Sequence, residues 1–543
     1  MKSKKALANF VLGVVLFGFG AAAAFGATNE TDVVARIRST IASVREQIEY
    51  LDDKYSKDDA EWLKYKADVE ALFKRCENTL THDSIDAETL NSLMDDLNKI
   101  DRRLLMKLPA GPQGPGRFGA YYTKLKYYSQ WDRYWRVGQF ADVVVQFDDA
   151  GHKFVFWRGT NYIPHWVTDN GIWYNNEFNE AWETVGSSEP MSDKQCRYSH
   201  VRVIENNPAR VVIHWRYALN DVKYRIAWPD KKTGWGDWSD EYYTIYPDAV
   251  GVRHIILHSS HWGDDAVRHT DDVGHEWHEG IVVYNAHSRP EESVEIDAVH
   301  VANMKGEIGK WSWETPGKPT TPTPEGSNIV VMNVKSKTKP FVISPEGCRL
   351  LPYEGSQGGS HFRWRDHWPT TMEPVPGRDA SGERAAHGSF FHIARIPIYQ
   401  QGDDWVSKVH LHGMTRKTAG ELAPLAKSWL YPPELKLESS NFTSEGFDKA
   451  QRAYVLTCKK SGKPSKLEFQ LAASEDRPVV NPAFVVKNWP ADEPELKVNG
   501  KKLSPGKDFR AGYERTLRAN NLIIWVRAES VKPMSISLSP VGG

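Results

Sequence analysis

The chain has 543 residues, with 69 basic and 70 acidic side chains, and it contains 21 tryptophans, 22 tyrosines and 20 phenylalanines. This length suffices for roughly two to four domains with ample cores. The balanced charge argues against a nucleic-acid binder, which carries a basic excess, but it leaves room for a local basic cleft that binds an acidic ligand. Tryptophan is large and rigid with a polar N–H, so its enrichment is typical of ligand-binding surfaces as well as of cores.

Residues 1–27 have the pattern of a secretory signal peptide. Three lysines lie within the first five residues, a short apolar run follows from Phe10 to Phe19, and small residues come next. A membrane anchor is the alternative, but the run is short and no later segment is long enough to span a bilayer. We therefore expect a secreted or periplasmic protein that has no membrane partner after signal removal.

Residues 28–108 predict a three-helix bundle. Apolar residues recur three and four positions apart in three runs, Val34–Leu51, Trp62–Cys76 and Leu90–Leu104. This spacing places them on one face of each helix. We expect the three helices to pack antiparallel, and we assign them no catalytic role.

The rest of the chain is predicted to be mainly β. Three prolines and four glycines in Leu108–Gly119 end the helical region. Short runs rich in β-branched and aromatic residues then alternate with turns. We predict a large antiparallel β-sandwich as the catalytic domain over 109–427 and a smaller C-terminal β-sandwich over 428–543, with a hairpin turn at Asn499-Gly500. A propeller is the alternative, although no 40-residue repeat with a blade signature is present.

The segment Phe154–Tyr174, FVFWRGTNYIPHWVTDNGIWY, combines many rings with many hydrogen-bond donors. A turn at Arg158-Gly159-Thr160-Asn161 and the following Pro164 interrupt a strand-like run, so polar side chains there can face one cleft. The candidate cleft residues are Trp157, Arg158, Asn161, Tyr162, His165 and Trp166. The alternative is a tryptophan-braced turn in which the arginine and the asparagine satisfy buried carbonyls.

A second cluster contains His275 and His278, which flank Glu276 and precede Glu279. The order His-Glu-x-His-Glu lacks the helical zinc spacing, and in a strand the two histidines would point to opposite faces. We expect them to line a substrate cleft, and we leave open a metal role or a plain surface position.

A third cluster is cationic and aromatic. Its members are His361, Arg363, Trp364, Arg365, His367, Trp368, Arg378, Arg384, His387 and His392. Rings stack on the face of a pyranose and guanidinium groups bind carboxylate or sulfate, so the cluster suits an anionic sugar. We expect Arg365, Trp368, Arg378 and His387 to bind the substrate. The four cysteines are far apart, which leaves one disulfide open without a readable pairing.

Several of these segments resemble secreted bacterial polysaccharide lyases of the ulvan-lyase-like kind. The resemblance rests on FWRGTNYIPHWVTDNGIWYNNEF, HEWHEGIVVYN, RDHWP and NPAFVVKNW, and it extends from about residue 115 onward without the helical bundle. It implies β-elimination on a uronic-acid-containing polysaccharide, sulfated or not. Such an enzyme neutralises the uronate carboxylate, removes the C5 proton and expels the 4-linked oxygen.

The residues predicted for these roles are Arg158 and Asn161 as neutralisers, His165 or His367 as the base, and Tyr162 or Tyr246 as the acid. This mechanism requires no cofactor, although a divalent cation stays open, and the expected partner is an acidic polysaccharide and not a nucleic acid. The oligomeric state, the polymer and endo or exo action are left open. The alternatives are a glycoside hydrolase with two carboxylates flanking the bond and a non-catalytic glycan-binding protein.

Overall fold

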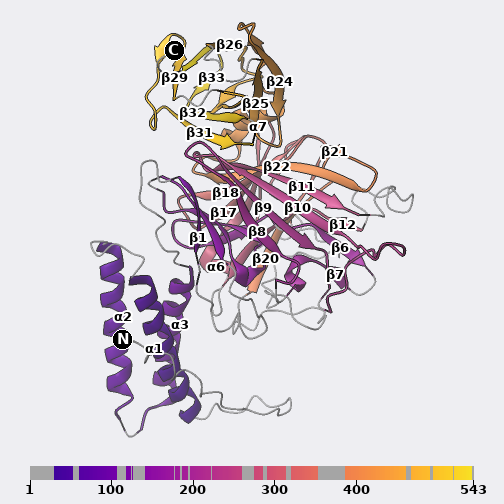
Figure 1. Ribbon diagram of the computed structural model, residues 1–543. Coiled ribbons are helices and arrows are strands. Elements are labelled where there is room, and N and C mark those ends of the chain that lie inside the picture. Colours follow the sequence, from indigo (N-terminus) through magenta and orange to yellow (C-terminus); the bar gives the residue numbers. More distant parts are fainter. Residues whose placement is uncertain are drawn as a thin grey trace, which may run out of the picture.

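The computed structural model describes most of the chain, in these ranges: 30–52, 60–82, 84–106, 118–123, 125, 141–148, 150–176, 178–183, 186–193, 196–221, 223–259, 274–284, 290–312, 319–352, 386–459, 466–489, 493–517 and 519–540. Within them the fold is mainly β, as predicted, with an N-terminal helical region and two β-rich regions (Figure 1).

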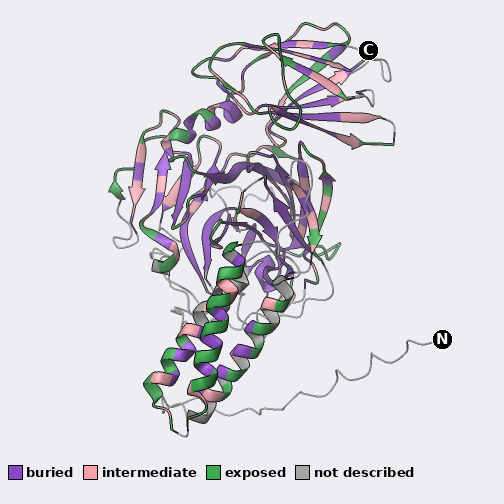
Figure 2. Ribbon diagram, turned by 90° about the vertical axis from the view of Figure 1, so that its left-hand side faces the viewer, coloured by how far each residue is buried: buried purple, intermediate pink, exposed green. Residues whose placement is uncertain are grey.

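The N-terminal region is the predicted three-helix bundle. Its helices are α1 (Glu30–Asp52), α2 (Ala60–Thr79) and α3 (Ala87–Met106). The apolar seams form one buried cluster that includes Trp62 and Phe73. Their exposed faces appear as green stripes along the helices in Figure 2. Asp86 caps α3, because its carboxylate accepts a hydrogen bond of 2.7 Å from the backbone N–H of Thr89.

Two large antiparallel sheets pack face to face in the central region. The eight-stranded sheet has the order β1 (Gly119–Thr123), β2 (Asp142–Gln146), β3 (Lys153–Phe156), β4 (Pro164–Val167), β5 (Trp173–Asn175), β13 (Glu279–Tyr284), β20 (Ala386–Ala394), β19 (Arg349–Pro352). The eleven-stranded sheet has the order β16 (Pro319–Thr321), β15 (Ile308–Trp311), β14 (Val294–Ala302), β17 (Ile329–Val334), β18 (Lys339–Ile343), β22 (Trp405–Thr415), β11 (Val250–His258), β10 (Trp238–Ile245), β9 (Val211–Ala218), β8 (His200–Asn206), and β21 (Gln400–Gln401) pairs with β22. This is the predicted large sandwich, and its strand β16 lies in a stretch of the sequence that is rich in proline and threonine.

The core of this sandwich is aromatic. Phe154 and Trp166 of the smaller sheet pack against Tyr243 of the larger sheet, with Phe154 and Tyr243 ring centroids 5.4 Å apart. Side chains alternate across a strand, so Trp215 and Tyr217 of β9 enter this core, while His214 and Arg216, which alternate with them, point to the other face. That alternation fixes which residues of the large sheet are available to a ligand.

Short elements complete the central region. They are η1 (Arg158–Thr160), η2 (Pro190–Ser192), α6 (Pro290–Ser293), η3 (Gly420–Leu422), α7 (Ala423–Leu430) and a three-stranded sheet of β12 (His275–Glu276), β6 (Glu180–Glu183) and β7 (Gly186–Ser188). Trp429 of α7 packs against Val409 and Leu411 of β22, which covers part of the outer face of the large sheet.

The C-terminal region is a second, smaller sandwich. One sheet has the order β23 (Leu435–Leu437), β26 (Leu467–Leu471), β34 (Met534–Pro540), β29 (Pro494–Val498), β30 (Lys501–Lys502), and the other β24 (Phe442–Asp448), β25 (Ala453–Cys458), β28 (Ala483–Lys487), β32 (Asn520–Val526), β31 (Phe509–Arg515). A third pair is β27 (Val479–Val480) with β33 (Glu529–Ser530). Asn499 and Gly500 both have positive φ between β29 and β30, so the predicted hairpin turn is confirmed.

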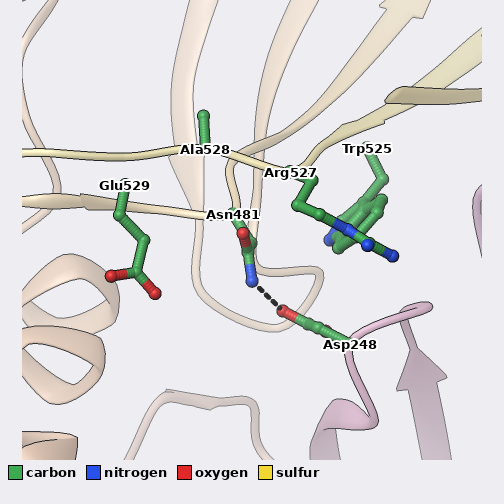
Figure 3. Close-up of a pocket in the computed structure, with 6 residues that line it drawn as sticks. All are labelled: Asp248, Asn481, Trp525, Arg527, Ala528 and Glu529. Atoms are coloured by element: carbon green, nitrogen blue, oxygen red, sulfur yellow. Dashed lines mark hydrogen bonds between the residues drawn. The ribbon is translucent and has the colours of Figure 1, made fainter. Parts of the chain in front are cut away.

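The two sandwiches are joined by a packed junction. Tyr246 and Ala209 of the central region contact Ile523 and Trp525 of the C-terminal region in one buried cluster. Asn481 Nδ2 donates a hydrogen bond of 3.0 Å to Asp248 across this junction (Figure 3).

All four cysteines are free thiols, so the disulfide left open by the sequence is not formed. Among the helices of the described ranges, none is long and apolar enough to cross a membrane.

Candidate functional site

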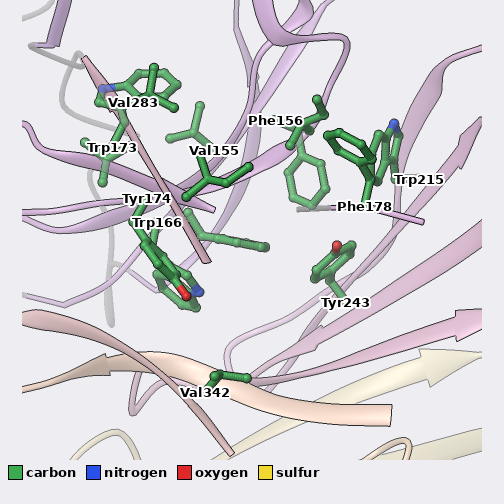
Figure 4. Packing of buried hydrophobic residues seen from close by; sticks show 14 of the residues in the cluster. Val155, Phe156, Trp166, Trp173, Tyr174, Phe178, Trp215, Tyr243, Val283 and Val342 are labelled. Atoms are coloured by element: carbon green, nitrogen blue, oxygen red, sulfur yellow. The ribbon is translucent and has the colours of Figure 1, made fainter. Parts of the chain in front are cut away.

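The ring-rich segment 154–174 forms β3, η1, β4 and β5 inside the central sandwich. Figure 4 shows Phe156, Trp166, Trp173 and Tyr174 within the packed core. The side chains of its candidate residues are all at most 2% exposed, namely Trp157, Arg158, Asn161, Tyr162, His165 and Trp166. A polysaccharide cannot reach them in this conformation. The prediction that they form the open wall of a cleft is therefore corrected.

Arg158 has a structural role in the buried turn. Its guanidinium forms a buried ion pair with Asp142 and donates a hydrogen bond of 2.6 Å to the carbonyl of Leu125. Burial raises the pKa of Asp142 to about 6, although the charge of Arg158 opposes that shift. The pair binds η1 to the start of β2, which is the braced-turn alternative and not a carboxylate-neutralising role.

Asn161 and Tyr162 continue the same turn in the left-handed region, with φ of 57° and 62°. The Asn161 side-chain amide donates to the carbonyl of Asp193, so it too has a structural role in place of the predicted neutralising one. Burial raises the pKa of Tyr162 well above its usual value, so this phenol keeps its proton. Gly159 is required here, because a Cβ would lie 2.5 Å from the ring of Trp157.

His165 lies on β4, directly opposite Asn175 of β5. Its Nδ1 lies 2.7 Å from the carbonyl of Ile163, and its Nε2 lies 3.1 Å from Nδ2 of Asn175. These contacts fix the imidazole with Nδ1 as donor and Nε2 as acceptor. Burial lowers the pKa of His165 to about 3, so the ring is neutral at ordinary pH. Sequence reasoning did not single out Asn175.

The other described candidates are buried at separate places. Tyr246 donates to the carbonyl of Gln451 at 2.7 Å in the junction, and burial raises its pKa to about 12, so its predicted role as a cleft acid is corrected. Trp166 Nε1–H donates to Nδ1 of His412 at 2.8 Å in the core. These positions exclude direct contact with a polymer in this conformation.

The histidines predicted to bind substrate are also dispersed. His275 Nε2 lies 2.6 Å from Asp237, while His278 packs against His410 inside the sandwich with ring centroids 4.7 Å apart. His387 lies buried on β20. The remaining candidates, Arg365, His367, Trp368 and Arg378, lie outside the described residues, as do His361, Arg363, Trp364 and Arg384 of the same cluster.

An accessible cluster of suitable chemistry lies on the outer face of the large sheet, at the ends of β9, β10, β11 and β22. We call it the Asp240 site. Strand register places Trp238 opposite His258, and His258 opposite Trp405. Neighbouring strands are about 4.8 Å apart, so these three residues form a row about 10 Å long. Each of the three is partly exposed, and all three lie outside the part of the sheet that α7 covers.

Asp240 holds the polar part of this site together. Its Oδ1 accepts a hydrogen bond of 2.6 Å from His214, and its Oδ2 accepts bonds of 3.0 Å from His258 and 2.9 Å from Arg216. Burial opposes ionisation of this carboxyl, but the hydrogen bonds from the two histidines and the charge of Arg216 outweigh it and hold its pKa well below the usual range. Asp240 is therefore a permanent carboxylate.

Arg216 and His258 are the most accessible polar side chains of the Asp240 site. Their side chains are 43% and 42% exposed, whereas that of His214 is 10% exposed. Because both contact the same oxygen of Asp240, the guanidinium and the imidazole lie beside each other. His258 uses Nε2 for Asp240, which leaves Nδ1 as the ring atom for a substrate proton.

Aromatic rings surround these groups. The Arg216 guanidinium carbon lies 5.2 Å from the ring centroid of Trp238, and Trp235, 62% exposed, lies 6.1 Å from Trp238. Tyr242 stacks on His214 with centroids 4.7 Å apart, and burial together with the charge of Asp240 raises the pKa of its phenol. Exposed indoles beside an arginine are suited to a sugar ring that carries a carboxylate.

The described residues contain no group of three or more histidine, cysteine, aspartate or glutamate side chains placed to hold a metal ion. The Asp240 site was hidden in the sequence because its members alternate with core residues on separate strands. One signal was available in the sequence: site residues alternate with core residues along two strands. The alternating site residues are His214 and Arg216 in one strand and Trp238, Asp240 and Tyr242 in the other.

Comparison with known proteins gives distant structural likeness. No protein-family model matches the chain, and no curated protein matches it. Galactose 1-epimerase from Lactobacillus acidophilus NCFM aligns with 55% of this chain and 99% of its own at 9% identity and a TM-score of 0.24. A Paenibacillus xanthan lyase aligns with 74% of this chain and 37% of its own at 9% identity and a TM-score of 0.26. A heparinase III aligns with 80% and 55%, respectively, at 11% identity and a TM-score of 0.21. Likeness this distant carries no argument about activity, and the ulvan-lyase-like resemblance stays a prediction.

Proposed function

We propose that the protein is a secreted polysaccharide lyase that cleaves a uronic-acid-containing polysaccharide by β-elimination at the Asp240 site. The observation that carries the proposal is the pairing of His258 with Asp240 beside Arg216, in a partly exposed row between Trp238 and Trp405. It places a proton acceptor, a carboxylate binder and sugar-stacking rings on one accessible surface. The sequence resemblance to lyases and the signal-like residues 1–27 support the same proposal.

Each group has a role in the proposed reaction. The free N–H groups of Arg216 bind the uronate carboxylate, which lowers the energy of the enolate that forms when the C5 proton leaves. Nδ1 of His258 accepts that proton. The electron pair forms the C4–C5 double bond and the C4–O bond breaks, while the departing oxygen takes a proton from the His258 imidazolium or from water. Asp240 fixes the orientation of the imidazole throughout.

Asp240 itself is not suited to be the acid of a glycoside hydrolase. A glycoside hydrolase needs one carboxyl group that is protonated to act as the acid. The histidine and arginine contacts keep the pKa of Asp240 low, so it cannot supply that proton at neutral pH. A glycan-binding protein without catalysis uses the same rings and Arg216, and the test below distinguishes it.

The test is incubation of the purified mature protein with ulvan, alginate, pectate, glycosaminoglycans and glucuronan while ultraviolet absorbance from the C4–C5 double bond is followed. A rise with one polymer establishes the lyase and its substrate class. Reducing ends without absorbance indicate a hydrolase, and binding without either product indicates a glycan-binding protein; both outcomes refute the proposal.

A further inference from the structure

A pocket lies at the junction of the two sandwiches, well away from the Asp240 site. It is open to solvent, has a volume of about 400 Å³ and is lined by Asp248, Asn481, Trp525, Arg527, Ala528 and Glu529 (Figure 3). Asp248 lies in the turn between β10 and β11, at the opposite end of β10 from Trp238. We call this pocket the junction pocket.

Some of the polar groups of the junction pocket already form hydrogen bonds within the protein. Asp248 accepts hydrogen bonds of 3.0 Å from Asn481 and from Arg452. Trp525 is different, because its Nε1–H is buried and has no hydrogen-bond partner among the described residues. A buried donor without a partner is uncommon in folded proteins and indicates a place where a ligand or a water molecule supplies the acceptor.

Arg527 covers the indole of Trp525. Its guanidinium carbon lies 5.7 Å from the ring centroid, and Figure 3 shows it stretched across the ring. Arg527 is exposed, so its long side chain can rotate away without disturbing packing. Rotation opens the edge of Trp525 to a ligand in the pocket and leaves the guanidinium at its rim.

The charges of the junction pocket select the class of ligand. Arg527 and Glu529 are of opposite sign, and the carboxylate of Asp248 is balanced by Arg452. A simple anion meets two carboxylates in this lining, and a simple cation meets carboxylates that already pair with Arg452 and Lys417. Hydroxyl groups both donate and accept hydrogen bonds, so a polyhydroxyl ligand satisfies all of these groups together. A volume of this size is in the range of small-ligand pockets.

We propose that the junction pocket binds a sugar unit of a polysaccharide as an anchoring site separate from the reaction site. The inference extends the proposed function, since it takes the same class of polymer as the ligand. The unpartnered Trp525 N–H donates to a sugar hydroxyl, while Asp248, Arg527 and Glu529 bind the neighbouring hydroxyl groups. A long polymer held here stays attached to the protein between cleavage events at the Asp240 site.

The test is affinity electrophoresis of the full chain in gels that contain each of the five polymers named above. All variants carry His258→Gln, so that the polymer is not consumed. Trp525→Phe removes the N–H and replaces the indole by a phenyl ring, and Arg527→Gln changes an exposed side chain. Trp489→Phe in the core of the C-terminal sandwich is the matched control. We expect one polymer to retard the parent, with the affinity lowered about fivefold by Trp525→Phe and by Arg527→Gln and unchanged by Trp489→Phe.

Two results contradict the proposal that the junction pocket binds a sugar unit. One is that no polymer retards the parent protein, and the other is that both pocket variants migrate like the Trp489→Phe control. Circular dichroism and thermal unfolding verify that Trp525→Phe is folded, and Arg527→Gln gives an answer in any case because it alters only an exposed position. The absorbance assay on the protein with His258 intact is independent of retardation, so failure of the pocket and failure of the lyase are distinguishable.

Discussion

Replacement of His258 by glutamine tests the proposed chemistry most directly. Glutamine retains an N–H that can donate to Asp240, but it has no ring nitrogen that can accept the C5 proton. The other two partners of Asp240, His214 and Arg216, stay in place. Since the His258 side chain is 42% exposed and makes a hydrogen bond to one oxygen, we expect the free energy of unfolding to fall by no more than about 1 kcal/mol.

The expected loss of activity follows from the role of a general base. Such a group contributes roughly 100- to 10,000-fold, which corresponds to about 2.7 to 5.5 kcal/mol of activation free energy. We therefore expect kcat for double-bond formation on the polymer identified in the panel to fall at least 100-fold in His258→Gln, with polymer affinity retained. The measurement is initial rate by absorbance, together with affinity electrophoresis on the same polymer.

A matched control is available on the same strand. His254 lies four residues earlier on β11 and on the same face, where it contacts Tyr399 with ring centroids 5.5 Å apart. His254 has no role in the proposed reaction, so His254→Gln should keep kcat within about threefold. A reduction of less than tenfold in His258→Gln, or equal losses in both variants, refutes the assignment of His258 as the base.

Three further predictions address the neutralising group, the buried turn and pH. Arg216→Met should lower kcat/KM about 100-fold or more, because one preorganised charged donor to the carboxylate is lost; an unchanged value in the absorbance assay contradicts its role. Arg158→Met should lower the free energy of unfolding in urea by about 3 to 5 kcal/mol, because Asp142 stays buried without its partner, and a loss below about 1 kcal/mol contradicts the structural assignment. Burial lowers the pKa of His165 and of His412 to about 3, against about 6.5 in an unfolded chain, so the unfolded state binds protons first as pH falls. The free energy of unfolding should therefore be highest above pH 7 and should fall by about 2 kcal/mol for each of these two histidines by pH 5. Urea unfolding across that pH range measures it, and a free energy that does not change with pH contradicts the prediction.

Local patterns in the sequence were sufficient to predict the architecture. The three- and four-residue spacing of apolar side chains predicted α1, α2 and α3, and the β-branched and aromatic runs predicted two sandwiches. Both signals arise from neighbours along the chain, because a helix or a strand repeats its buried face every few residues. The Asn499-Gly500 hairpin was predictable for the same reason, since the turn depends on two adjacent residues.

The site depended on contacts that the sequence does not encode locally. Arg158 and Asn161 have the residue types of a substrate cleft, but only the fold brings Asp142 and the Asp193 carbonyl to them and makes them a buried brace. Likewise His258 lies 18 residues from Asp240, and strand register alone places them 3.0 Å apart with Arg216 from a third strand. The sequence by itself therefore determined which segments form helices and strands, because those preferences are local. Only the tertiary structure decided which polar side chains are buried and which are presented together, because that depends on the pairing of strands distant in the chain.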